Sequence, residues 1–155
     1  MSLSSNAMRR YNHLIGETEA AYHDAAVRFG LSDSAMSILY TLCTYAEGYR
    51  CPLSEVCRST WISKQTINSA LRRLEADGAV YLMRTSGRRK DVCLTARGIQ
   101  LAQTTVAKLI AAENAVFASW PEEDVETYLR LNQDYLTAFR DELDKQIDKG
   151  DPNAS

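Results

Sequence analysis

The sequence predicts a mainly α-helical protein with a small β-hairpin. Apolar residues recur at helical spacing along most of the 155 residues, whereas two short apolar runs flank a basic tip within residues 79–94. Hydrophobic residues make up 45% of the chain and charged residues 25%, which is ordinary for a folded domain. No run approaches the roughly 20 apolar residues of a membrane span, and no secretory leader is recognisable. We therefore expect a cytoplasmic protein without membrane contact.

The two ends of the chain differ from the rest in composition. Residues 1–7 are small and polar and end in Ser-Asn-Ala before a second methionine, Met8, so we interpret them as a leader added for expression. Residues 148–155 are predicted to form a disordered tail. The remaining residues, 8–147, are predicted to form one domain, with a central part at 31–95 between helical arms at 9–29 and 96–147.

Two helices precede the centre of the chain. The apolar spacing over residues 9–29 predicts a first helix that ends at Gly30. Ser32 is expected to cap a second helix, which continues to Gly48. The second helix is apolar on most of its faces, which predicts a position at the centre of the domain.

A helix-turn-helix pattern follows. Pro52 is expected in the first turn of a short third helix, and Ser63 is expected to cap a fourth. The fourth helix carries one apolar stripe, formed by Ile67, Ala70, Leu71 and Leu74. Its opposite face is polar and uncharged or basic, and such side chains can read base edges and phosphates. The residues on or beside that face are Gln65, Thr66, Asn68, Ser69, Arg72 and Arg73.

A basic hairpin comes next. Residues 79–83 and 92–94 are predicted to be paired strands, joined by a tip with Gly87, Arg88, Arg89 and Lys90. The net charge of the chain is only −2, yet residues 58–90 sum to +6 and the remainder to −8. A basic lobe on an acidic body is typical of a protein that binds a polyanion, although charge runs are also common on solvated faces.

The rest of the chain is expected to be helical. Thr95 should cap a fifth helix that continues to about Ala118, despite Gly98 in its first turn. A sixth helix is expected to begin with Ser119 as its cap and Pro121 in its first turn. Its long apolar seam, interrupted by Asn132, exceeds what a small core can cover, which favours a homodimer.

No arrangement of residues typical of a catalytic or metal-binding site is apparent in the sequence. The four cysteines lack Cys-x-x-Cys spacing, and His13 and His23 lie far from them in sequence, so neither a metal site nor a cofactor is expected. No nucleophile triad, phosphate loop or carboxylate pair indicates an enzyme. Cys43 is the least implausible reactive group, although its place on an apolar helix face favours simple packing.

Taken together, these segments resemble the MarR family of winged-helix transcriptional regulators. The resemblance covers about residues 9–147, and its most specific features are the fourth helix, the following Leu74-Glu75-Ala76-Asp77-Gly78, the basic hairpin and Leu94-Thr95-Ala96-Arg97-Gly98. It implies a homodimer, held by the terminal helices, that binds pseudo-palindromic double-stranded DNA. Members of the family commonly respond to small aromatic or phenolic ligands, to oxidants or, more rarely, to metals, and a small aromatic effector is the one we expect. A ligand-responsive repressor is the function we expect.

The polar face of the fourth helix and the basic tip are expected to share the contacts with DNA. We expect Gln65, Thr66, Ser69 and Arg72 in the major groove. Phosphate or flanking contacts are expected from Ser63, Lys64, Asn68 and Arg73, and wing contacts from Arg88, Arg89 and Lys90. One departure is that Ser86-Gly87 stands where the family often has an acidic residue that positions a wing arginine. The sequence itself, rather than the resemblance, suggests where an effector would bind. It is expected to contact side chains of the first two helices, namely Tyr11, Tyr22, His23, Met36 and Tyr40, although aromatic residues at helical spacing more often belong to the core.

Two other functions fit the same sequence less well. A dimeric winged helix could use its basic lobe to bind a protein, although the polar face of the fourth helix argues against this. A thiol-based redox sensor would need a reactive cysteine, and the first helix, where redox-sensing members carry theirs, contains none.

Overall fold

The second helix lies at the centre of the winged-helix part of the molecule. The computed structural model describes residues 5–45, 48–59 and 62–148. Within them the elements are α1 (Asn6–Phe29), α2 (Asp33–Thr44), β1 (Arg50–Pro52), α3 (Leu53–Arg58), α4 (Lys64–Ala76), β2 (Val80–Arg84), β3 (Lys90–Leu94), α5 (Ala96–Thr104), α6 (Val106–Ala118) and α7 (Glu122–Asp148). The chain divides into two units, Met1–Ala111 and Ala112–Ser155.

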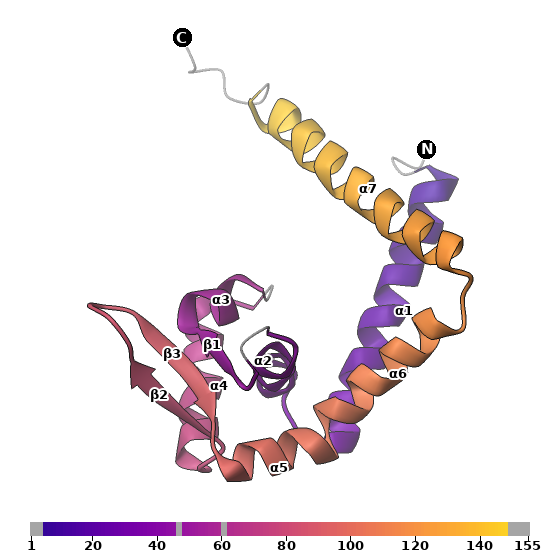
Figure 1. Cartoon of the computed structure of the whole chain (residues 1–155). Helices are drawn as coiled ribbons and strands as arrows, with labels where there is room; N and C mark the ends of the chain where they lie inside the picture. Colours follow the sequence, from indigo (N-terminus) through magenta and orange to yellow (C-terminus); the bar gives the residue numbers. More distant parts are fainter. Residues whose placement is uncertain (1–4, 46–47, 60–61, 149–155) are drawn as a thin grey trace. The chain divides into compact units, whose positions relative to one another are not determined.

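The core of the first unit forms around α2, as its apolar composition predicted. Ile38, Leu39 and Leu42 are completely buried. Helix α2 contacts α1, α3, α4 and α5, and also β1 and β3. The apolar stripe of α4 packs into the same core, since Ile67, Ala70, Leu71 and Leu74 are all buried. Figure 1 shows α2, α3 and α4 gathered beside the small sheet, with the β2–β3 hairpin projecting from it.

The sheet has three strands rather than the predicted two. It is antiparallel in the order β1-β3-β2, with Cys51 opposite Val92 and Leu82 opposite Val92 on the other side. Strand β1 was not predicted because three residues are too few to show alternation and one of them is Pro52. This proline ends the strand and precedes α3, rather than lying in the first turn of that helix.

Three of the six predicted helix starts are confirmed by their caps. The side-chain oxygens of Ser32, Ser63 and Thr95 accept hydrogen bonds from the backbone N–H groups three residues ahead. The bounds of the first two helices also differ from the prediction. Helix α1 begins at Asn6 rather than residue 9, because Ser5 caps it, and α2 ends at Thr44 rather than Gly48. Ala46, which was expected within α2, lies outside the described residues.

Gly98 has a structural role that its sequence position did not indicate. A Cβ atom added there would lie 1.9 Å from the backbone oxygen of Ala79. That oxygen accepts a hydrogen bond from the backbone N–H of Thr95 at 3.0 Å, and the Thr95 hydroxyl donates mainly to the neighbouring Gly78 carbonyl, at 2.6 Å against 3.2 Å to Ala79. The first turn of α5 can therefore rest directly on the residue preceding β2 only because position 98 has no side chain.

The single fifth helix predicted from Thr95 to Ala118 is two helices. They are separated at Thr105, whose backbone is non-helical, with φ −124° and ψ −92°. The hydroxyls of Thr104 and Thr105 donate to the carbonyl of Leu101, at 3.0 and 2.7 Å. Side-chain bonds of this kind compete with the backbone ladder and bend helices. The apolar period continues through the break, so periodicity alone could not reveal it.

The second unit consists of the end of α6 and the long helix α7. Trp120 contacts Phe117 and Tyr128 edge to face, with ring centroids 5.7 and 5.4 Å apart. Ser119 donates to the carbonyl of Val116 at 2.6 Å, and Pro121 lies just before α7 rather than within it. The start of this helix was therefore predicted too early: Ser119 was the expected cap, and the helix begins at Glu122.

The apolar seam of α7 is exposed in the single chain. Val125, the first member of the predicted seam, is half-buried, and the others are 41–63% accessible; they are Leu129, Leu136, Phe139, Leu143 and Ile147. Asp148, assigned to the tail by sequence, is the last residue of α7, and residues 149–155 lie outside the described part of the chain. None of the described helices combines the length and apolar character needed to cross a membrane.

Candidate nucleic-acid interface

Helix α4 presents a polar outer face opposite its buried stripe. Lys64, Gln65, Thr66 and Ser69 are exposed, as are Arg72 and Arg73, whereas Asn68 is half-buried. Since one helical turn rises about 5.4 Å, Gln65 and Arg72 lie about two turns apart on this face. Helix α4 thus offers an amide near its N-terminal end and guanidinium groups further along.

Hydrogen bonds within α4 restrict what its hydroxyls can offer. The Ser63 oxygen accepts from the Thr66 backbone N–H at 3.2 Å and is 2.9 Å from the Thr66 hydroxyl. The Ser69 hydroxyl donates to the carbonyl of Gln65 at 3.1 Å. Ser69 can therefore present an acceptor to a ligand without breaking this bond, while the side-chain amide of Gln65 can both donate and accept.

The wing is the hairpin between β2 and β3. Residues Ser86 to Arg89 make a tight turn, closed by the Arg89 N–H donating to the Ser86 carbonyl at 3.0 Å. Gly87 has a φ of +57°, in the left-handed region that favours glycine at this place in a hairpin turn. Arg88, Arg89 and Lys90 are all exposed at or beside the tip.

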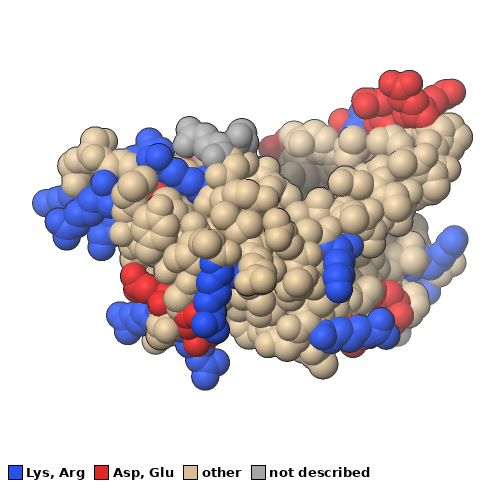
Figure 2. Space-filling model, turned by 60° about the horizontal axis from the view of Figure 1, so that its bottom comes forward, with Lys and Arg blue, Asp and Glu red and all other residues tan. Residues whose placement is uncertain are grey.

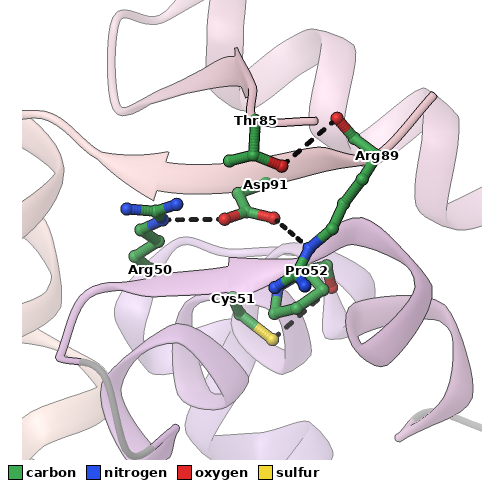
Figure 3. A network of polar contacts seen from close by, with 6 residues as sticks. All are labelled: Arg50, Cys51, Pro52, Thr85, Arg89 and Asp91. Atoms are coloured by element: carbon green, nitrogen blue, oxygen red, sulfur yellow. Dashed lines mark hydrogen bonds and ion pairs between the residues drawn. The ribbon is translucent and has the colours of Figure 1, made fainter. Parts of the chain in front are cut away.

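Asp91 ties the wing to the adjacent strand, a role that sequence analysis missed. Its side chain is fully buried, with one oxygen 2.7 Å from Nε of Arg50 and the other 3.3 Å from Nε of Arg89. Figure 3 shows the carboxylate between the two guanidinium groups. The hydrogen bond from Arg50, followed by that from Arg89, holds the pKa of Asp91 below its usual value against the opposing effect of burial. The sequence does contain a signal for this role: an Asp stands at the start of the apolar run Val92-Cys93-Leu94, two residues after an arginine.

Basic side chains gather on the wing. Arg84 lies opposite Lys90 in the β2–β3 register, close to Arg88 and Arg89 at the turn. Figure 2 shows a dense group of Lys and Arg side chains at the wing end of the first unit. Two like charges directly opposite in a sheet repel each other, so such a cluster is stabilised by a polyanionic ligand.

The candidate effector residues lie on α1 and α2 and differ in burial. Met36 is buried in the core, and His23 on α1 is exposed and paired with Asp33, its Nδ1 lying 3.0 Å from the carboxylate. Tyr40 packs partly buried against the core. Tyr11 and Tyr22 are about 16 Å apart along α1, as its rise per residue requires. An effector site made by these residues stays a prediction.

The cysteines show no arrangement for chemistry. None of the four is in a disulfide, and Cys51 and Cys93 are buried. Burial raises the pKa of the Cys43 thiol, which disfavours the reactive thiolate. Within the described residues no group of three or more His, Cys, Asp or Glu side chains could hold a metal ion.

Comparison with solved structures identifies the fold. A MarR-family transcriptional regulator from Rhodococcus sp. RHA1 superposes with a TM-score of 0.63 at 22% identity, covering 88% of this chain and 95% of that one. MepR from S. aureus in its DNA-binding conformation gives 0.72 at 17% identity, covering 87% and 99%; its complex with DNA gives 0.65. NadR in complex with 4-hydroxyphenylacetate gives 0.66 at 17% identity, covering 86% and 94%.

The sequence comparisons add no closer relative, since no family model and no curated protein matches the chain. Identities of 16–22% establish the fold alone. The order of elements, the three-stranded sheet and the projecting hairpin agree with it. This chain has the winged-helix fold of the MarR-family transcriptional regulators.

Proposed function

We propose that this protein is a sequence-specific DNA-binding transcriptional regulator of the MarR type, acting in the cytoplasm as a homodimer. The observation that carries the proposal is the pairing, on one unit, of a polar outer face on α4 with an arginine-rich wing. The first can read bases in a major groove, and the second can reach phosphates or the adjacent minor groove.

The exposed residues of α4 divide by chemistry into readers, which can bond base edges, and anchors, which can bond phosphates. A glutamine amide can bond two edges of an adenine, and an arginine can bond two acceptors of a guanine, so Gln65 and Arg72 are the main readers. Thr66 and Ser69 contribute short-range contacts beside them. Lys64, Arg73 and Asn68 are placed for phosphates, together with Ser63 at the helix start. Arg88, Arg89 and Lys90 serve the wing.

The exposed apolar faces support a homodimer. Leu14, Ile15 and Val27 on α1 are 41–63% accessible, in addition to the α7 seam. Exposed apolar stripes of this length are unusual in a monomer and mark protein interfaces. A second copy is the economical partner, because a two-fold dimer presents two wings to a pseudo-palindromic site.

An aromatic effector and a repressor role form the finer part of the proposal. Among the structures that share the fold, NadR is complexed with 4-hydroxyphenylacetate. This chain carries tyrosines on α1 and α2 that could stack on such a ring, namely Tyr11, Tyr22 and Tyr40. His23 could pair with its carboxylate if the bond to Asp33 were exchanged. Release of DNA on binding would make the protein a ligand-responsive repressor.

Selection of bound duplexes from random sequence tests this function. We expect enrichment of an inverted repeat whose half-sites lie about one helical turn apart. The double variant Gln65→Ala, Arg72→Ala should lose the preference while keeping salt-dependent binding to any duplex. A chain that uses its basic lobe for a protein partner would instead show no sequence preference at physiological salt. Repeating the selection with phenolic acids then tests the effector.

A further inference from the structure

The side chain of Arg89, an arginine of the wing turn, is bonded to a residue outside the turn. The carboxylate of Asp91 has no accessible surface, yet both of its oxygens are engaged, one by Arg50 and one by Arg89. Arg50 belongs to β1, the strand that leads directly into α3, whereas Arg89 belongs to the turn. A single buried side chain therefore joins the base of the helix-turn-helix to the tip of the wing.

We propose that Asp91 is a positioning residue for Arg89, and that Arg50 anchors Asp91 in this role. The inference rests on the proposed DNA-binding function. Arg89 keeps 55% of its side chain accessible while its Nε is bonded to Asp91. The Nη amino groups are not used by Asp91 and remain for phosphate or base-edge acceptors.

The anchor sets the orientation of the carboxylate. The bond from Arg50 to Oδ2, at 2.7 Å, is shorter than the 3.3 Å bond from Arg89 to Oδ1. The tighter contact fixes Asp91, and the looser one restricts Arg89 without taking up its whole guanidinium group. An arginine held in this way loses less side-chain freedom on binding DNA than an arginine on an unsupported turn.

The backbone of the turn acts in the same direction. The carbonyl of Arg89 accepts from the N–H of Thr85 at 3.2 Å and lies 3.5 Å from its hydroxyl, as drawn in Figure 3. Both ends of Arg89 are thus restrained, its backbone by Thr85 and its side chain by Asp91. The acid absent from Ser86-Gly87 is replaced by an acid that approaches from the sheet.

Positioning and simple charge predict opposite results for Asp91→Asn. This substitution removes a negative charge close to the DNA, and by charge alone it should strengthen binding and steepen its salt dependence. If Asp91 positions Arg89, affinity for the selected duplex should fall about tenfold, within the usual range for coupled contacts. Glu75→Gln on the exposed surface of α4 makes the same change in charge and should bind at least as tightly as the unmodified protein.

A double-mutant cycle shows whether Asp91 acts through Arg89. Affinities are measured by fluorescence anisotropy for the duplex recovered by selection and for a scrambled duplex of the same length. In the Arg89→Ala background, Asp91→Asn should change affinity by less than about twofold. An undiminished effect in that background, or tighter binding by Asp91→Asn alone, overturns the proposal.

A second variant covers the case in which Asp91→Asn fails to fold, which circular dichroism reports. Arg89→Lys keeps the charge at an exposed position but lacks Nε, and it should weaken specific binding about as much as Asp91→Asn is expected to. Full affinity in Arg89→Lys refutes positioning. Failure of the proposed function itself looks different, because the unmodified protein would then not prefer the selected duplex over the scrambled one.

Discussion

Replacement of Gly98 by alanine tests how the winged helix is joined to α5. The added Cβ would lie 1.9 Å from the Ala79 oxygen, and an ordinary contact begins near 3.4 Å, so the two groups must separate by about 1.5 Å. The neighbour is backbone, so no side-chain rotation can relieve the clash. The first turn of α5 must move away from the residue that precedes β2.

The size of the effect follows from the hydrogen bonds that this movement breaks. The Thr95 N–H donates to the Ala79 oxygen at 3.0 Å and the Thr95 hydroxyl donates to the Gly78 oxygen at 2.6 Å, and a shift of about 1.5 Å breaks both. Losing two hydrogen bonds costs about 1 kcal/mol each, and local overpacking adds to this cost. The higher helix propensity of alanine offsets about 1 kcal/mol of it. We expect Gly98→Ala to lower the free energy of unfolding by about 2–3 kcal/mol.

Urea unfolding at one fixed protein concentration provides the measurement, because stability depends on concentration in a dimer. Gly16→Ala is the matched control. It makes the same substitution inside α1, where the added Cβ meets nothing within 4 Å, and should raise stability by about 0.5–1 kcal/mol. A Gly98→Ala protein as stable as the unmodified one would refute the reasoning.

Three further predictions concern DNA, assembly and acid stability. Arg72→Ala should cost about 1–3 kcal/mol of specific DNA affinity and relax the preference at one base pair. Lys64→Ala should instead weaken binding to all duplexes alike and lower the slope of log affinity against log salt by about 1. A gel-shift salt series compares the two variants. Phe139→Asp, on the exposed seam of α7, should convert the dimer to a monomer in sedimentation, and an unchanged mass would argue against that seam as the interface. The pKa of Asp91 is lowered in the folded protein, mainly by Arg50, so its stabilising effect is present above the unfolded pKa near 4 and is lost as the pH falls through the folded value. The free energy of unfolding should therefore fall less in Asp91→Asn than in the unmodified protein between pH 7 and a pH below about 4, as measured by denaturation at both.

The outline of the fold was predictable because its signals are local. Caps at Ser32, Ser63 and Thr95 depend on a side chain and a backbone N–H three residues away, and all three are confirmed. The apolar stripe of α4 follows from helical period alone. The polar face opposite it was therefore predictable too, residue by residue, whereas its role in binding DNA stays a proposal.

Other features depend on strand pairing, packing or side-chain hydrogen bonds that hydrophobic periodicity does not reveal. Strand β1 is three residues long and exists because β3 pairs with it, about forty residues further along the chain. The break at Thr105 lies within an uninterrupted apolar period, where side-chain hydroxyls decide between one helix and two. The effector residues were chosen as aromatics on two helices, and only the packing of those helices shows that Met36 belongs to the core.

The sequence alone determined that this chain is a helical protein with a basic hairpin and a polar helix face beside it. Periodicity, capping and charge segregation act over a few residues and can be read directly. Only the tertiary structure decided that Gly98 is required by the Ala79 carbonyl and that Asp91, rather than a residue at the wing tip, holds Arg89. The first depends on segments that meet only when the sheet forms. The second depends on Arg50, which is 41 residues from Asp91 in sequence and reaches it only because β1 pairs with β3.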